Sequence, residues 1–291
     1  MTPTSLLAPL AGVRVLSLAL NLPGPAALLR CRAMGANCLK LEPPAGDPMH
    51  LYNPGAYAEL HAGIEVREAD LKTAPAQAAL HEELARTDVL LTSFRPSALR
   101  KLGLDWPALQ ARHPRLSQVA IVGAAGERAE EPGHDLTYLA DAGLVPGTQL
   151  PPTLFADMAG ALMASEAVLQ AVMQARAGGG TRVEVALHGA AEWLALPRNW
   201  GLTAPGGAVG GAHAGYRVYP CADGRVAVAA LEPHFARRLA EAAGLPTDDM
   251  HAPAAHEGVA AWLARRTRAE LDALAAQRDI PLHTLAPEAP H

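Results

Sequence analysis

Aromatic residues, cysteines and long apolar runs are all scarce in this sequence of 291 residues, of which only 4% are Phe, Trp or Tyr. The chain has three cysteines, Cys31, Cys38 and Cys221. They are too few for a disulfide framework, an odd number cannot all pair, and none has the spacing of a metal ligand. No apolar run approaches the roughly 18 residues of a membrane span. The N-terminus lacks the cationic start and apolar stretch of a signal peptide. We therefore expect a cytoplasmic protein with no bound metal and no membrane partner.

Basic tracts are missing as well. The chain carries 24 Lys and Arg against 29 Asp and Glu, for a formal net charge of −5. No basic stripe is available for a nucleic-acid partner. Neither G-x-x-x-x-G-K-[ST] nor G-x-G-x-x-G occurs, which excludes a P-loop and a standard dinucleotide fold. A few Lys and Arg side chains that converge locally could still bind a small anionic ligand.

What the chain does contain is an alternation of short apolar runs with helix-forming segments. This alternation predicts an α/β fold with a Rossmann-like parallel sheet. In such sheets ligands bind beyond the carboxyl ends of the strands. A long helix is expected from Asp157 or Met158 to about Ala177, closed by three glycines. The expected strands cover residues 13–20, 38–41, 88–93, 116–122 and 181–187.

Composition changes near residue 200 and predicts a second domain. We expect a large Rossmann-like domain over residues 1–196, a Gly-rich linker over 197–215 and a small α+β domain over 216–291. The small domain should begin with a hairpin that has Asp223-Gly224 at its turn, followed by helices over 233–243 and 256–277.

Three residues stand out as acid–base candidates. Glu232 precedes Pro233 at an apparent helix N-cap, where Ser, Thr, Asp or Asn is usual; the alternative is a carboxylate that merely interacts with the helix dipole. Asp157 lies at the expected start of the long helix. It could act as a base or nucleophile, or it could simply be the N-cap of that helix. His134 could transfer protons near neutral pH, although most single histidines do not.

Four cations lie near the ends of expected strands: Lys40, Arg95, Arg100 and Lys101. Any one of them could be a solvated surface charge. Their shared location favours a role in binding an anionic ligand.

Several ordered motifs resemble family III CoA-transferases, from about Pro9 to Gly244. They include Met34-Gly35-Ala36, Asp70-Leu71-Lys72, Phe94-Arg95-Pro96 and Leu102-Gly103-Leu104. The resemblance implies an interlocked homodimer in which each chain has a large Rossmann-like, CoA-binding domain and a smaller α/β domain. In this family a C-terminal segment returns to the large domain. Because the chain ends at His291, we expect this segment to be missing.

The resemblance also implies site residues. Gly133-His134-Asp135, Asp157 and Glu232-Pro233 match the motifs of the α-methylacyl-CoA racemase branch, with His134, Asp157 and Glu232 as catalytic residues. Coenzyme A enters only as part of an acyl-CoA substrate, with no covalently bound cofactor. The residues expected to contact it are Lys40, Leu91, Arg95, Arg100, Lys101, Gly133, Asp135 and Tyr138.

Three functions remain open from the sequence. The first is a racemase or epimerase of 2-methylacyl-CoA thioesters, in which two acid–base groups flank the α-carbon. The second is a CoA-transferase in which Asp157 attacks the thioester and forms a mixed anhydride. The third is a non-catalytic relative that binds acyl-CoA.

Overall fold

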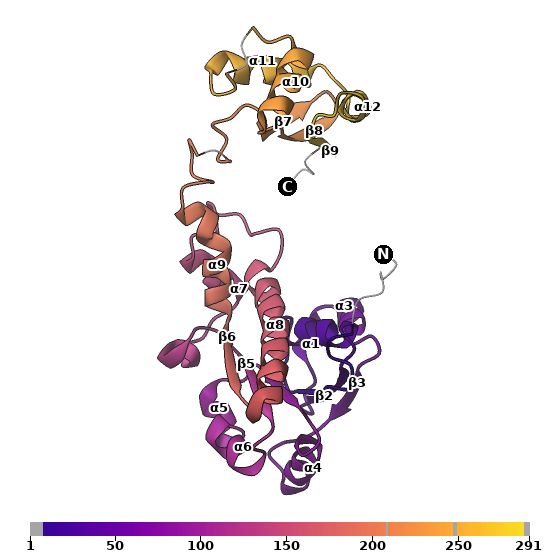
Figure 1. The fold of residues 1–291 in the computed structure, drawn as a ribbon, viewed down its shortest axis with the longest axis vertical. Helices are drawn as coiled ribbons and strands as arrows, with labels where there is room; N and C mark the ends of the chain where they lie inside the picture. Colours follow the sequence, from indigo (N-terminus) through magenta and orange to yellow (C-terminus); the bar gives the residue numbers. More distant parts are fainter. Residues whose placement is uncertain (1–7, 208, 247–248, 288–291) are drawn as a thin grey trace. The chain divides into compact units, whose positions relative to one another are not determined.

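The computed structural model describes residues 8–207, 209–246 and 249–287, and the chain divides into two compact units, residues 1–195 and 196–291 (Figure 1). Each unit has a hydrophobic core of its own. The division falls within one helix, α9 (Leu187–Asn199).

A six-stranded sheet organises the first unit, with strand order β3-β2-β1-β4-β5-β6. Every neighbouring pair is parallel, which confirms the predicted α/β class. The central strands β4 and β5 are fully buried because both faces of a parallel sheet are covered by helices. The strands are β1 (Arg14–Ser17), β2 (Asn37–Glu42), β3 (Glu65–Glu68), β4 (Val89–Thr92), β5 (Ser117–Val122) and β6 (Arg182–Ala186).

Helices cover the two faces of this sheet separately. On one face, alternate side chains of β4 and β5, such as Leu91 and Val119, pack with α1 and α8. On the other face, Leu90 packs with leucines of α4, α5 and α6. The helices of this unit are α1 (Pro23–Ala33), α2 (Pro48–Tyr52), α3 (Pro54–Leu60), α4 (Ala74–Leu84), α5 (Pro96–Lys101), α6 (Trp106–Arg112), the 3-10 turn η1 (Gly126–Glu130), α7 (Asp135–Asp141), α8 (Phe155–Gly178) and the start of α9.

Helix α8 is the longest element, with 24 residues. Its most apolar window has a mean hydropathy of 1.2, so by length and composition alone the helix could cross a membrane. Half of that window is buried inside the unit, and the helix packs against α1, β5 and β6. These contacts are those of a core helix in a globular domain.

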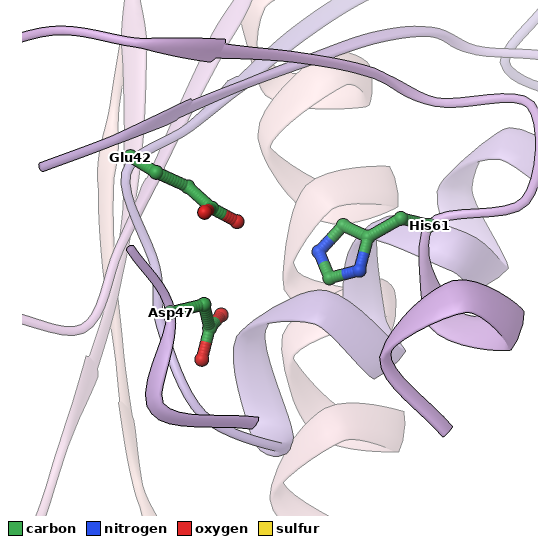
Figure 2. Close-up of side chains that lie close together, drawn as sticks. All are labelled: Glu42, Asp47 and His61. Atoms are coloured by element: carbon green, nitrogen blue, oxygen red, sulfur yellow. The ribbon is translucent and has the colours of Figure 1, made fainter. Parts of the chain in front are cut away.

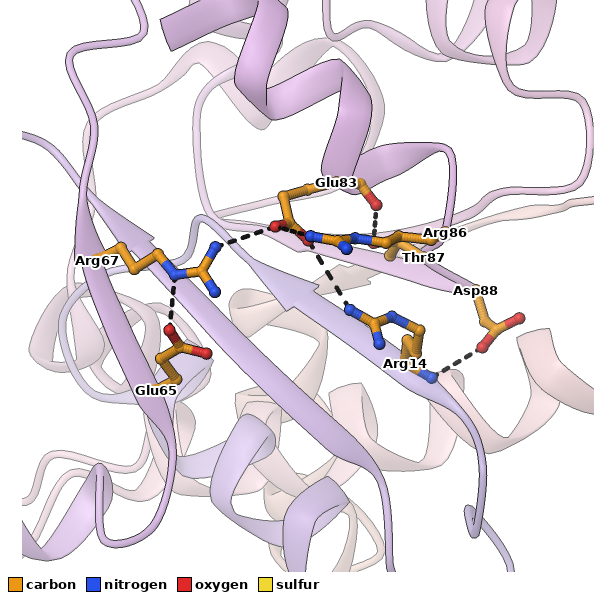
Figure 3. A network of polar contacts seen from close by, with 7 residues as sticks. All are labelled: Arg14, Glu65, Arg67, Glu83, Arg86, Thr87 and Asp88. Carbon is orange, nitrogen blue, oxygen red and sulfur yellow. Dashed lines mark hydrogen bonds and ion pairs between the residues drawn. The ribbon is translucent and has the colours of Figure 1, made fainter.

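A charged network lies at the amino-terminal edge of the sheet (Figure 3). Glu83, at the end of α4, accepts hydrogen bonds from Arg67 of β3 and from Arg86. Arg14 of β1 approaches the same carboxylate at 3.9 Å. The Arg14 backbone N–H also donates to Asp88 at 2.8 Å. One carboxylate thus links α4 to two strands.

The second unit contains a three-stranded antiparallel sheet of order β7-β8-β9. The predicted hairpin is present, but its two-residue loop is Ala222-Asp223 and Gly224 already pairs with Cys221. The helix expected over 256–277 is two helices, because Thr267 begins a new helix with a capping box to Glu270. The elements are β7 (Tyr216–Cys221), β8 (Gly224–Ala229), α10 (Pro233–Ala243), α11 (Pro253–Ala264), α12 (Arg268–Arg278) and β9 (Leu282–Leu285).

Candidate functional site

A cavity of about 160 Å³ opens at the carboxyl ends of the strands of the first unit. This is the edge where open parallel sheets bind ligands. Residues that follow β1, β4, β5 and β6 all contribute to the lining. The polar lining residues are Asn21, Ser93, Arg95, Glu131, His134, Tyr138 and Asp157.

Asp157 occupies the third position of α8, because the helix begins at Phe155 and its N-cap is Leu154. The alternative reading of Asp157 as an N-cap is therefore wrong. Its own backbone N–H donates to Asp135 Oδ1 at 3.0 Å. Asp135 is 4% exposed and begins α7. The backbone N–H of Asp157 is thus already engaged, while its side chain lines the cavity.

Burial and the neighbouring Asp135 carboxylate together raise the pKa of Asp157 to about 6. The amino end of α8 is expected to lower this pKa through the helix dipole. Removal from water and like-charge repulsion outweigh that effect. A carboxyl group with such a pKa is suited to general acid–base work near neutral pH.

His134 is the N-cap of α7 and lines the same cavity. Its backbone N–H donates to the Thr137 hydroxyl, which fixes the entry into the helix. Gly133 lies beside Tyr138, since a Cβ at Gly133 would come within 2.5 Å of the Tyr138 ring. Burial and Asp157 raise the pKa of Tyr138. The N-cap and the first turn of α7 therefore bring an imidazole and a buried phenol to one cavity.

Glu232 belongs to the second unit, as the N-cap of α10 ahead of Pro233. Its side chain is exposed and makes no capping hydrogen bond. The expected N-cap position is therefore present, without the capping contact that Ser or Asp would supply.

Among the expected ligand-binding cations, Arg95 lines the cavity at the entry to α5. Arg100 and Lys101 are exposed in the last turn of α5. Arg100 donates to Glu130 at 3.4 Å. Leu91 lies in β4 with a fully buried side chain, so only its backbone could meet a ligand.

The expectation that Lys40 binds an anionic ligand is not supported by its surroundings. Lys40 is fully buried inside β2, rather than after the strand. Its Nζ lies 2.5 Å from Asp47 Oδ2, 2.9 Å from Glu42 Oε1 and 2.8 Å from His61 Nε2. A buried ammonium needs such partners because desolvation otherwise makes the charge too costly.

Figure 2 shows the acceptors around this lysine, Glu42, Asp47 and His61, converging on one point. Their ligand atoms lie within 4.8 Å of one another, the spacing of a metal site. The Lys40 ammonium lies within 2.9 Å of all three and supplies the positive charge there. Burial lowers the pKa of His61, so its neutral ring donates through Nδ1 to the Tyr57 carbonyl and accepts through Nε2.

The same network supports the wall of the cavity. Asp47 Oδ1 accepts a hydrogen bond from the Asn21 backbone N–H at 3.0 Å. Asn21 has a left-handed backbone with φ of 64° and lines the cavity. That conformation is uncommon outside glycine, so the contact helps to hold it. Ser93 was not expected as a lining residue; its position directly after β4 was the available signal.

The protein-family model described as CoA-transferase family III matches residues 10–287. The chain is 30% identical over 268 residues to succinate–glutarate CoA-transferase of Agrobacterium fabrum, covering 81% of this chain and 67% of that protein. It is 29% identical over 260 residues to alpha-methylacyl-CoA racemase of Homo sapiens, covering 83% of this chain and 66% of that protein.

A third relative, the cinnamoyl-CoA:phenyllactate CoA-transferase of Clostridium sporogenes, is 35% identical over 150 residues. That match covers 47% of this chain and 36% of the relative. The chain thus spans between 36% and 67% of the length of these curated relatives.

Solved structures agree with the fold. A hypothetical protein from Mycobacterium tuberculosis has a TM-score of 0.82 at 24% identity, over 94% of this chain and 83% of that one. A CAIB/BAIF family protein from Brucella suis has a TM-score of 0.78 at 25% identity, over 97% and 84%.

Asp157→Asn should stabilise the protein at alkaline pH. Because the folded chain holds this proton more tightly than the unfolded chain, the penalty for ionising Asp157 is absent below about pH 4 and complete above about pH 6. The free energy of unfolding should rise by up to about 3 kcal/mol near pH 8, with no gain near pH 4. Urea unfolding at both pH values measures this, with Glu166→Gln on the same helix as control. Equal effects at the two pH values would contradict the raised pKa.

Lys40→Met should destabilise the first unit by about 3–5 kcal/mol, because Asp47 and Glu42 would remain buried without their cation. Denaturant unfolding at neutral pH measures the loss. The exposed Lys72→Met is the matched control and should change the free energy of unfolding by less than about 0.5 kcal/mol. A similar small effect of both variants would show that the buried network contributes little.

Proposed function

This chain belongs to CoA-transferase family III, and on that premise we propose that it transfers the α-proton of an acyl-CoA thioester. The proposed reaction is the racemisation or epimerisation of a 2-methylacyl-CoA. One juxtaposition supports it: His134 and Asp157, which are 23 residues apart in the chain, line the same cavity.

The chemistry requires two groups of this kind. A thioester acidifies its α-proton, but removing it still needs a positioned base. Inversion of the α-carbon needs removal from one face and return to the other. Asp157, with a pKa of about 6, serves one face. The imidazole of His134 serves the other.

Glu232 is proposed as the third catalytic residue, a carboxylate that takes part in the same proton transfer. The exposed carboxylate of Glu232 has no capping role that would compete with this function.

The CoA portion is proposed to bind along the same edge of the sheet. Arg95, Arg100 and Lys101 present positive charge after β4, where phosphate groups would be bound. Gly133 and Tyr138 contact the reactive end from the cavity wall. Asp135 acts on Asp157 because its carboxylate accepts a hydrogen bond from the Asp157 backbone N–H and because its charge lies nearby.

Transfer of CoA between carboxylic acids is the second candidate. The free Asp157 side chain could attack the thioester carbonyl, forming an aspartyl anhydride as the C–S bond breaks and the CoA thiolate leaves. The specific observation in its favour is the match to succinate–glutarate CoA-transferase, which is as extensive as the match to the racemase.

We also propose that the chain acts as a cytoplasmic homodimer. Large apolar side chains of α8 and α9 are exposed in the single chain, among them Met158 at 43%, Leu162 at 51% and Trp193 at 68%. Exposed apolar groups on successive turns of a helix are typical of an interface.

Deuterium exchange at the α-carbon of a 2-methylacyl-CoA in heavy water tests the reaction. Asp157→Asn and His134→Gln should each lower exchange by about 10²–10⁴-fold, because each removes one acid–base group. Each variant should block one epimer more strongly than the other. Glu232→Gln should have a smaller effect in the same assay. Glu166→Gln, an exposed carboxylate on α8, is the matched control and should leave the rate unchanged.

Other outcomes separate the alternatives. CoA transfer to an added free acid, with an acyl-enzyme trapped by hydroxylamine and no α-exchange, would replace the racemase proposal with the transferase. Binding of CoA without either signal would leave a non-catalytic acyl-CoA-binding protein.

Mass measurement in solution tests the dimer. The expected mass is twice the chain mass of 30.3 kDa. Leu162→Glu should shift the population toward monomer, because it introduces a charge into the proposed apolar interface. The exposed Glu82→Gln on α4, which covers the other face of the sheet, should not. A wild-type protein that stays monomeric at high concentration would overturn the proposed assembly.

A further inference from the structure

The hydroxyl of Tyr138 has no partner within the protein. Tyr138 is 9% exposed and lines the cavity together with His134 and Asp157. Its hydroxyl makes no hydrogen bond to any of the described residues and still reaches the surface of the cavity. A buried tyrosine normally has a partner for its O–H group. The hydroxyl is therefore free to bond to a ligand.

Two glycines make room for this hydroxyl. A Cβ at Gly123, directly after β5, would lie 2.4 Å from the Tyr138 oxygen. A Cβ at Gly133 would lie 2.6 Å from the same oxygen. Both glycines also line the cavity. The oxygen thus lies beside backbone that carries no side chains, where a ligand atom can approach closely.

Tyr138 keeps its proton at the pH of the proposed reaction. Burial and the charge of Asp157 raise the pKa of the phenol above its ordinary value of 10.0, and Arg95 opposes this shift only in part. The hydroxyl is therefore a hydrogen-bond donor, and not an anion, at neutral pH.

The proposed chemistry needs a donor in this cavity. When a base removes the α-proton of a thioester, negative charge develops on the carbonyl oxygen. The backbone N–H of Asp157 is not available to stabilise it, because that group already donates to Asp135. Attack of a carboxylate on the thioester carbonyl would place negative charge on the same oxygen. A donor at this point therefore serves both candidate reactions.

Other donors of the cavity are less suited to this task. Arg95 and Asn21 are exposed, and the Ser93 hydroxyl already accepts a bond from the Leu20 backbone N–H at 3.0 Å. A hydrogen bond acts most strongly on a developing charge where water is excluded. Tyr138 is buried and lies close enough to Asp157 for that carboxylate to raise its pKa.

We propose that Tyr138 is a further catalytic residue, whose hydroxyl donates a hydrogen bond to the carbonyl oxygen of the bound thioester. The proposal rests on the function proposed above and adds to it the group that stabilises the enolate. Asp157 takes the α-proton, and the electrons of the broken C–H bond form the enolate. The enolate oxygen accepts the hydrogen bond, while the phenolic proton stays on Tyr138. Protonated His134 then delivers a proton to the opposite face, and the carbonyl forms again.

The infrared carbonyl band of a bound 2-methylacyl-CoA, isotopically labelled at the thioester carbon, tests this hydrogen bond without requiring turnover. Binding to the wild-type protein should lower the frequency of the band, because the oxygen accepts a hydrogen bond. Binding to Tyr138→Phe should not, since this variant keeps the ring and loses the donor. Tyr52→Phe, which removes an exposed hydroxyl from α2, is the matched control and should behave as wild type.

Deuterium exchange at the α-carbon measures the catalytic effect. Tyr138→Phe should lower kcat by about 10²–10³-fold with little change in KM, because the donor acts mainly on the charge of the transition state. Gly123→Ala should have a similar effect, since its Cβ displaces the hydroxyl. In the Tyr138→Phe background the same alanine should cost little more, because the displaced oxygen is absent.

The two measurements separate this inference from the proposed function. Equal carbonyl bands in the wild type and Tyr138→Phe, or no band from bound thioester, would overturn the role of Tyr138 whatever the exchange rate is. An unchanged kcat in Tyr138→Phe, beside a wild type that exchanges, would overturn it as well. A band shift that Tyr138→Phe abolishes, without any α-exchange, would support the hydrogen bond and contradict the racemase; the loss in Tyr138→Phe should then appear in CoA transfer.

Discussion

The close packing of α8 against the sheet is the constraint on which the candidate site depends. The buried face of α8 consists mostly of small residues, and Gly160 is one of them. A Cβ at Gly160 would come within 2.2 Å of Leu187 Cδ2, so the missing side chain at Gly160 leaves the space that Leu187 occupies against the helix. Farther along, Ser165 accepts a hydrogen bond from Arg30 of α1 at 3.0 Å. Because a helix is rigid over one turn, these contacts fix the position of Asp157, three residues before Gly160.

The first unit buries carboxylates in two contrasting ways. Asp47 is 2% exposed and is matched by the Lys40 ammonium and by two backbone N–H groups. Asp157 has a second carboxylate, Asp135, as its neighbour and no cation paired with it among the described residues. A buried carboxylate that is paired with a cation stabilises the structure, whereas one without a cation has a raised pKa. The same unit thus holds a charge-paired network that contacts Asn21 and a carboxyl group with a raised pKa that lines the same cavity.

Much of the fold followed from the sequence, because strands such as β4 and β5 are continuous apolar runs between helices. The site was partly predictable for a similar reason: His134, Asp157 and Arg95 all lie beyond strand ends, which a parallel sheet brings to one edge. The surroundings of Lys40 could not be predicted from the sequence, because its partners, Asp47 and His61, are positioned by the tertiary arrangement of two short helices. The break at Thr267 has a local signal in the sequence, since Thr267 and Glu270 have the spacing of a capping box.

The magnitude of each effect explains why Asp157 differs from an ordinary helix-terminal aspartate. A helix amino end typically stabilises a carboxylate by about 0.3–1 kcal/mol. A pKa raised from 3.8 to about 6 corresponds to about 3 kcal/mol in the opposite direction. Burial and Asp135 must therefore exceed the dipole effect severalfold. The base that results is stronger than a solvated aspartate and is still largely ionised at neutral pH, which is the compromise that proton transfer from a weak carbon acid requires.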